Sequence, residues 1–393
     1  MKALLIDFGS TCTKTALVSL DPPGLLGVSQ APTTVESDLM EGLEEALKEF
    51  SPVQLDGVVF KRASSSAAGG LRIVAVGLVP ELTVKAAREA ALGAGARVLS
   101  TYAYILNETE IAEISLLKPD LLLLAGGTDG GDRKTILENA SRIAASGLSV
   151  PVVLAGNKSA VHEAATILQG KVPRVVIAGN VMPEVNRLDV EPAREAIRRL
   201  YLSEITKAKG LDQVQQQVGL AMPTPLAVMK AGELYWKASG DDVIIVDLGG
   251  ATTDIHSFAD GRPRRSGCIV KGLPEPLVKR SVEGDLGMRV SLLALLEIVP
   301  AGELIGHLPF VVAPDELKAH ARMVASSRAF LPGNEREFAF DCAFAVAAVR
   351  EALRRHAGSL AETYTPEGRL WVQRGKDLTE TATLLATGGA LVH

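Results

Sequence analysis

Apolar and polar positions in the first 60 residues predict a β-hairpin followed by a helix. Residues 2–7 (KALLID) predict a strand that is buried on both faces, and a second strand is expected near residues 15–20. The Gly-Ser-Thr sequence between them is typical of a hairpin tip. Apolar residues recur at helical spacing in residues 38–50, so we expect a helix there with Asp38 as its N-cap.

Three later apolar runs each lead into a turn that contains glycine. The runs LLLLAGGTDGGD, VPVVLAGN and VPRVVIAGN predict strands, and helices are expected after the first two, at residues 133–145 and 159–168. Repeated strand–turn–helix units predict a mainly parallel sheet with helical crossovers. The glycines suit tight strand-to-helix turns. Asp129 and Asp132 flank two of these glycines, either as solvated carboxylates or as ligands of a divalent cation.

The pattern changes again after residue 185. Residues 186–206 are charged and predict a helix, and the following DQVQQQVGLAMPTP is interpreted as a connection between domains. Residues 226–238 predict a helix with small residues one turn apart, which would let another backbone approach closely. Residues 243–248 then predict a second buried strand like the one that opens the chain.

Composition narrows the class of protein. The 393 residues are 47% hydrophobic and 22% charged, with a formal net charge of −5, which is typical of a globular protein of two or three domains. Nucleic acid and anionic membranes are not expected as main partners, because both require clustered Lys and Arg. Three dispersed cysteines fit a reducing compartment, and no signal peptide or membrane span is predicted. We therefore expect a cytoplasmic protein.

Both buried strands end in an acidic, Gly/Thr-rich hairpin that suits phosphate binding. Glycines let backbone amides approach a phosphate, hydroxyls add donors, and a carboxylate at the turn can hold hydrated Mg²⁺. The two hairpins are DFGSTCTK and DLGGATTD, and neither a P-loop nor a Rossmann fingerprint is present. The candidate residues are Asp7, Gly9, Ser10, Thr11, Thr13 and Lys14 in the first hairpin, and Asp247, Gly249, Gly250, Ala251, Thr252 and Thr253 in the second.

Two such hairpins in one chain resemble the phosphate loops of the actin-like ATPase superfamily, which includes sugar kinases, Hsp70 chaperones and actin. Ala386-Thr387-Gly388-Gly389 is similar to the superfamily's adenosine motif, with alanine in place of the usual first glycine. The small-residue helix resembles the superfamily's connecting helix. Its counterpart should follow the adenosine motif, so we expect a C-terminal end that is shortened or degenerate.

The resemblance implies an α/β, actin-like (ribonuclease H-like) duplicated ATPase domain with an inserted α/β domain. The expected boundaries are 1–60 for the first half, 61–210 for the insert and 211–393 for the second half. ATP or ADP with Mg²⁺ would bind between two lobes. Asp7 and Asp247 would order the metal and the attacking water, the loops would hold the phosphates, and Thr387, Gly388 and Gly389 would contact adenosine.

A narrower resemblance covers nearly the whole chain. The segments SSSAAGGLRIVAVGLVPELTVKAAREAALGAGARV, LLLLAGGTDGGDRKTILENA, VMPEVNRLDVEPAREAIRRLY and DLGGATTDIHSF are similar to the glutamate mutase accessory family, called GlmL or MutL. That family implies association with an adenosylcobalamin-dependent mutase and ATP-driven release of damaged cobalamin from it. The sequence leaves open which mutase is the partner, whether the chain forms a homo-oligomer and whether it touches cobalamin.

Three functions remain open from the sequence. The first is an ATP-dependent reactivating chaperone for such a mutase. The second is a small-molecule kinase, which needs a base for a substrate hydroxyl, and the remaining carboxylates for that role are Asp129, Asp132 and Asp254. The third is a scaffold that binds nucleotide, or nothing, without catalysis.

Overall fold

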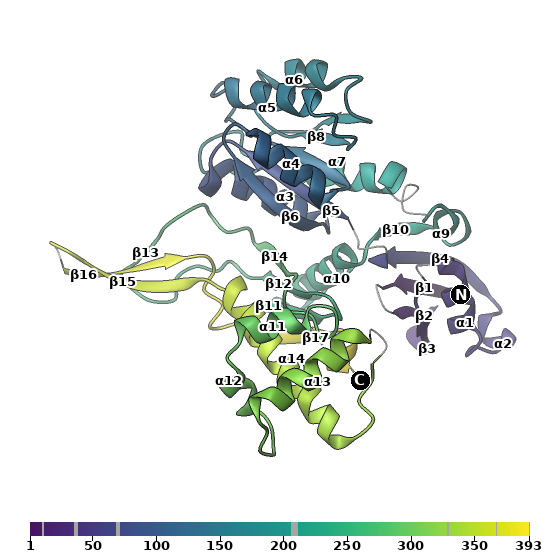
Figure 1. Ribbon diagram of the computed structural model, residues 1–393. Helices are drawn as coiled ribbons and strands as arrows, with labels where there is room; N and C mark the ends of the chain where they lie inside the picture. Colours follow the sequence, from purple (N-terminus) through teal and green to yellow (C-terminus); the bar gives the residue numbers. More distant parts are fainter. Residues whose placement is uncertain are drawn as a thin grey trace. The chain divides into compact units, whose positions relative to one another are not determined.

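The computed structural model describes residues 1–9, 12–34, 38–67, 71–205, 211–327, 330–366 and 368–392. The chain divides into two compact units, Met1–Ala227 and Val228–His393, which are described one at a time (Figure 1). In the described ranges, no helix has the length and apolar character needed to span a bilayer.

A five-stranded mixed sheet, ordered β10-β4-β1-β2-β3, contains the first predicted strand. The prediction that this strand is buried on both faces is wrong, because Leu5 is 42% exposed. Strand β1 pairs antiparallel with β2 and parallel with β4, and β4 pairs parallel with β10. The second strand begins at residue 12, three residues earlier than its pattern predicts. The strands are β1 (Lys2–Phe8), β2 (Cys12–Leu20), β3 (Pro23–Pro32), β4 (Val58–Ser65) and β10 (Leu220–Pro223).

Helix α1 (Leu39–Leu47) covers one face of this sheet. The Asp38 carboxylate accepts a hydrogen bond from the Met40 amide at 2.9 Å, which confirms the predicted N-cap. Leu43 and Ala46 on the helix are buried, as are the sheet residues on the face it covers. A short helix, α2 (Pro52–Leu55), follows.

A five-stranded parallel sheet, ordered β6-β5-β7-β8-β9, lies between β4 and β10 in the sequence. Its central strand β7 is the LLLL run, and all four leucines are buried because helices cover both faces. Leu122 and Leu124 pack against α4, α5 and α6, whereas α3 and α7 pack on the other side. The strands are β5 (Arg72–Gly77), β6 (Arg97–Ala103), β7 (Leu121–Leu124), β8 (Val152–Leu154) and β9 (Val175–Ile177).

The helices of this insert confirm the strand–turn–helix prediction. Helices α5 and α6 begin within two residues of the expected positions and end where predicted. The elements are η2 (Pro80–Val84), α3 (Lys85–Gly93), α4 (Glu108–Leu117), α5 (Lys134–Ala145), α6 (Val161–Leu168), α7 (Glu191–Leu200) and η3 (Tyr201–Ile205).

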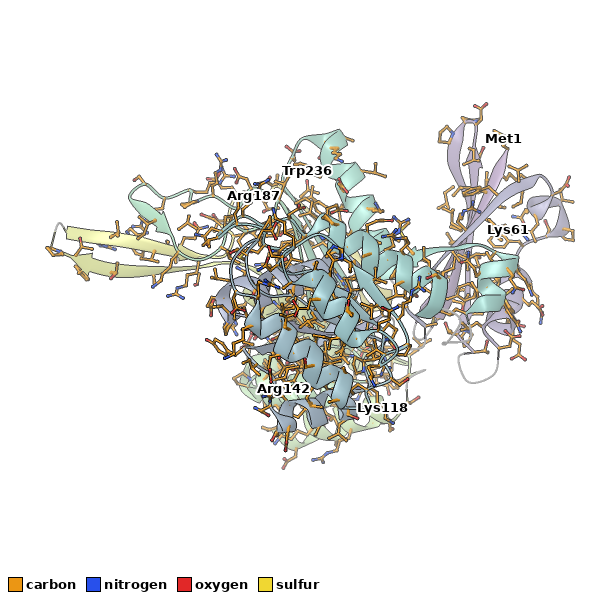
Figure 2. All side chains as sticks on the ribbon, turned by 90° about the horizontal axis from the view of Figure 1, so that it is seen from above. Met1, Lys61, Lys118, Arg142, Arg187 and Trp236 are labelled. Carbon is orange, nitrogen blue, oxygen red and sulfur yellow. The ribbon has the colours of Figure 1, made fainter. Side chains whose placement is uncertain are left out.

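The segment that the sequence suggested as a connection between domains has structure of its own. It forms α9 (Asp212–Gln217) and then β10, which joins the first sheet by pairing with β4. Helix α10 (Thr224–Ser239) begins directly after β10 and carries Trp236 (Figure 2). Within the second unit, α10 packs closely on the four-stranded sheet described next, because a Cβ at Gly232 would lie 2.4 Å from the Ile245 side chain.

A four-stranded sheet, ordered β14-β12-β11-β17, forms the centre of the second unit. Helices α11, α13 and α14 bury one face of β11 and β12 in an apolar core. The strands are β11 (Val243–Leu248), β12 (Thr253–Phe258), β14 (Val278–Glu283) and β17 (Thr383–Thr387). The helices are α11 (Leu292–Ile298), α12 (Ala301–Ile305), α13 (Pro314–Ser326), α14 (Glu335–His356) and α15 (Gly389–Val392).

A separate three-stranded sheet, ordered β13-β16-β15, extends from the same unit (Figure 1). Its strands are β13 (Cys268–Val270), β15 (Ser359–Thr365) and β16 (Gly368–Arg374). We call this sheet the ribbon.

The two mixed sheets repeat one topology. In each, the first strand pairs antiparallel with the second and parallel with a later strand, and the third strand pairs antiparallel with the second. The predicted α/β architecture, with a duplicated mixed sheet and an inserted parallel sheet, is thus confirmed. The boundaries at residues 60 and 210 stay a prediction, and β4 of the first sheet continues to Ser65.

Candidate functional site

Asp7 lies where the carboxyl ends of three parallel strands meet. It is the penultimate residue of β1, Ser64 occupies the register position beside it in β4, and Thr224 directly follows β10. The Ser64 and Thr224 hydroxyls both donate to Oδ1 of Asp7, at 3.0 and 2.5 Å. Carboxyl ends of parallel strands are a common place for ligand binding in α/β sheets.

The environment of Asp7 opposes ionisation. Burial raises the pKa of this carboxyl above its ordinary value, although the hydrogen bonds from Thr224 and Ser64 and the charge of Lys14 act in the opposite direction. Lys14 is the cross-strand partner of Asp7 in β2, so both side chains belong to one face of the sheet. A cation near Asp7 would favour its ionised form.

The turn after β1 requires glycine at position 9. The Gly9 amide donates to the Cys12 carbonyl at 3.1 Å, and a Cβ at Gly9 would lie 2.6 Å from that oxygen. Ser10 and Thr11, both predicted to contact phosphate, lie outside the described residues. Thr13 is fully buried on the face opposite Asp7, and its hydroxyl lies 3.1 Å from that of Thr33. The structure thus places the Thr13 hydroxyl inside the unit.

Asp247 occupies the equivalent position in the second unit. It is the penultimate residue of β11, opposite Asp254 in β12 and Thr387 in β17. These neighbours correspond to Lys14 and Ser64 beside Asp7. The internal duplication therefore gives each unit one aspartate at the same strand end, each next to a hydroxyl-bearing residue of a parallel strand.

The turn that follows β11 is anchored through its carbonyl groups. The Gly249 carbonyl accepts from the Met288 amide at 3.0 Å, and the Gly250 carbonyl accepts from the amides of Arg289 and Val290 at 2.8 Å each. The Ser291 hydroxyl donates to the Ala251 carbonyl at 2.7 Å. These hydrogen bonds to its carbonyl groups fix the conformation of the turn.

The backbone amides of the same turn are suited to binding an anion. Within the ranges that the structure describes, the amides of Gly250, Ala251 and Thr252 have no protein acceptor. Successive free amides of this kind form an anion-binding nest. Gly287 allows the anchoring loop to approach, because a Cβ there would lie 2.4 Å from the Ala251 carbonyl carbon.

The threonines and the second aspartate of this turn have structural roles. The Thr253 hydroxyl donates to the Leu286 carbonyl inside the unit. Asp254 forms a buried ion pair with Arg280, with side chains 7% and 2% exposed, and accepts from the Thr252 hydroxyl at 3.2 Å. Asp254 is therefore held by its partners and fixes Thr252 in place.

The adenosine-like motif ends β17 next to Asp247. Gly388 adopts a φ of +97°, and a Cβ there would lie 2.1 Å from the Leu248 carbonyl oxygen. A Cβ at Gly389 would meet no heavy atom within 4 Å. Gly388 is thus needed for packing between strand ends, whereas Gly389 leaves open space at the beginning of α15.

The two aspartates in the inserted sheet are also engaged. Burial opposes ionisation of Asp129, but hydrogen bonds from Asn180 and from Lys158 outweigh it and lower its pKa. Asp132 accepts from the Thr135 amide, in the first turn of α5, at 3.0 Å. Among the described residues, no three His, Cys, Asp or Glu side chains gather as a metal site.

Sequence reasoning missed Ser64, Thr224 and Gly287. The first two lie 57 and 217 residues from Asp7 along the chain, and only strand pairing brings them together. Thr224 has a weak signal, since it is a hydroxyl residue that follows the short apolar segment LAMP. Gly287 has no signal of its own, because its role is set by the backbone against which it packs.

Solved structures are similar to this chain only at a low level. A nucleotide-free acetone carboxylase matches with 16% identity and a TM-score of 0.37, covering 90% of this chain, which spans 63% of the carboxylase chain. A Ppx/GppA family member from Aquifex aeolicus matches with 10% identity and a TM-score of 0.26, covering 97% and 95% of the two chains. A propionate kinase from Francisella tularensis matches with 11% identity and a TM-score of 0.24, covering 98% and 96%.

Comparison with known sequences shows the family. Residues 3–393 match the family described as MutL protein. Protein MutL of Clostridium tetanomorphum is 43% identical over 400 residues, covering 99% of this chain and 86% of that protein. Together with the residues quoted above, this similarity extends over both units, and the chain belongs to the MutL protein family.

Proposed function

We propose that this chain is an ATP-binding accessory protein that reactivates an adenosylcobalamin-dependent mutase such as glutamate mutase. The observation that carries the nucleotide part is the anchored turn after Asp247, with three successive amides that have no protein acceptor among the described residues. Family membership supports the accessory part, because the glutamate mutase accessory role is what the resemblance implies for its members.

Each unit, taken by itself, carries groups of the kind that bind a magnesium nucleotide. Asp7 and Asp247 are the carboxylates proposed for Mg²⁺, the amides of Gly250–Thr252 for phosphate oxygens, and Gly389 for the adenosine side. When bound, Mg²⁺ neutralises phosphate charge.

The chain's own contribution is preorganisation. The Ser64 and Thr224 hydroxyls fix the Asp7 carboxylate, and the Met288–Ser291 segment holds the carbonyls of the turn so that its amides stay exposed to an anion. Donors fixed before binding require no reorganisation when charge arrives, which makes them effective for phosphate chemistry.

A small-molecule kinase is the less supported alternative. Its base would have to be Asp129, Asp132 or Asp254, and each of these carboxylates is already engaged. Asp129 accepts two hydrogen bonds, Asp132 accepts one from the Thr135 amide and Asp254 pairs with buried Arg280. A base needs a free lone pair within reach of the substrate proton.

Thermal stability with and without Mg-ATP tests nucleotide binding. Ligand at about 100 times its dissociation constant stabilises the native chain by roughly 2.7 kcal/mol. Asp247→Ala should lose this stabilisation, whereas Asp260→Ala, at a half-exposed aspartate on the same unit, should keep it. Equal stabilisation of the two variants would contradict the nucleotide assignment.

Recovery of inactivated mutase tests the accessory role separately. Glutamate mutase holding damaged cobalamin should regain turnover when wild-type chain, Mg-ATP and fresh adenosylcobalamin are added, but not with Asp247→Ala. Binding of mutase without recovery would indicate a scaffold. A phosphorylated metabolite in place of recovery would indicate a kinase.

A further inference from the structure

The ribbon formed by β13, β15 and β16 leaves the side of β15 uncovered. Strand β16 lies in the centre, and β15 is an outer strand seven residues long. Six of its seven residues are exposed, including Leu360 at 45% and Tyr364 at 78%. In both views no helix of the same unit lies over the outer half of the β15–β16 hairpin (Figure 1, Figure 2).

The edge of β15 lacks the features that usually protect outer strands. Natural proteins discourage strand addition with proline, lysine, bulges or very short edges. Strand β3, an edge of the first sheet, begins and ends with proline, and β14 carries Lys279 and Arg280. Strand β15 (SLAETYT) contains neither proline nor lysine, and its register with β16 is unbroken. Its outward backbone groups are thus a template for another strand.

The ribbon and the segments beside it are basic although the whole chain is acidic. Residues 264–271, which include β13 and its flanks, and residues 359–374, which run from β15 through β16, contain five basic and two acidic residues, against a net charge of −5 for the chain. Of these, Arg369, Arg374 and Glu362 lie on the ribbon strands themselves. The one charge on β15, Glu362, is paired with Arg369 at 2.7 Å. In the part of the chain that the structure describes, Arg265, Lys271 and Arg374 form no ion pair, and Arg265 stacks on Trp371 at 3.8 Å. These charges favour an acidic partner.

We propose that the β15 edge binds an extended acidic segment of a partner protein as an added strand. Main-chain hydrogen bonds would supply affinity, and Leu360 and Tyr364 would contact alternate side chains of the added strand. This assignment is independent of the nucleotide turn, so it can hold or fail whatever the outcome with Mg-ATP.

Peptide binding to the full-length chain tests strand addition. The probe is a labelled nine-residue peptide in which glutamate alternates with valine or threonine, followed by fluorescence anisotropy. A second peptide has the same sequence with N-methyl groups on all of its backbone amides, so it keeps the charge but cannot donate main-chain hydrogen bonds from either edge. A third has lysine in place of glutamate. We expect the first to bind about tenfold or more tightly than either control, because several main-chain bonds are lost on N-methylation.

Two variants of the chain locate the contact. Tyr364→Asp places a negative charge on the β15 edge and should weaken binding of the acidic peptide severalfold. Val311→Asp adds the same charge at a residue that is 96% exposed elsewhere in the unit, and should leave binding unchanged.

Several outcomes would overturn the proposal. Equal binding of the parent and N-methylated peptides would mean attraction by charge without strand addition. Absence of binding, or equal binding by the two variants, would exclude the β15 edge. A concentration-dependent dimer in sedimentation that Tyr364→Asp abolishes would assign the edge to a second copy of the chain instead.

Discussion

Replacing Gly388 by alanine should destabilise the second unit far more than the same change at Gly389. The two glycines are adjacent, and both belong to the motif expected to contact adenosine. A Cβ at Gly388 would lie 2.1 Å from the Leu248 carbonyl oxygen and 2.7 Å from its carbonyl carbon. A Cβ at Gly389 would meet nothing within 4 Å. Only the first substitution therefore forces β11 and β17 apart.

The magnitude follows from two effects. The φ of +97° at Gly388 is unfavourable for any residue with a Cβ, at about 1–2 kcal/mol. Overpacking against a backbone that cannot rotate away costs about 1–3 kcal/mol more. The free energy of unfolding should fall by roughly 2–5 kcal/mol for Gly388→Ala, and change by no more than about 0.5 kcal/mol for Gly389→Ala.

Urea unfolding followed by tryptophan fluorescence measures this difference in the unit that contains Gly388. Both tryptophans, Trp236 and Trp371, belong to the unit Val228–His393. With a denaturant dependence of about 2 kcal/mol per molar urea, the midpoint for Gly388→Ala should be lower by about 1–2.5 M. Midpoints that agree for the two variants would refute the close-packing argument. In a separate measurement, a lower ATP affinity of Gly389→Ala, whose fold should be undisturbed, would support the adenosine contact.

Three further changes test other parts of the argument. Asp7→Asn should gain stability over wild type as the pH rises above about 4 in thermal melts without ligand: the folded state raises the pKa of Asp7, so ionisation destabilises the wild-type fold as pH rises. A difference that stays constant with pH would contradict this. Arg280→Met leaves Asp254 buried and unpaired and should lower the free energy of unfolding by about 3–5 kcal/mol in urea. A loss under 1 kcal/mol would show that water reaches the pair. Gly250→Val should block phosphate approach to the free amides, and calorimetry that finds unchanged ATP affinity would assign the turn another role.

The sequence by itself determined the features that depend on neighbouring residues. The strands β1 and β11, the parallel strands of the insert and the Asp38 cap all follow from local spacing and side-chain chemistry. The two acidic, Gly-rich turns were also found this way, because a strand end, a glycine and a carboxylate are adjacent in the chain. The presence of two such turns in one chain predicted a duplicated fold without any knowledge of which strands pair.

Only the tertiary structure decided which side chains serve the candidate site. Strand alternation says that Thr13 and Lys14 face opposite ways, but it does not say which face α1 covers, and it is Thr13 that is buried. Ser64 and Thr224 reach Asp7 through pairing of strands distant in sequence. Pairing register and helix packing are set by the cooperative burial of the whole chain, which no local window contains.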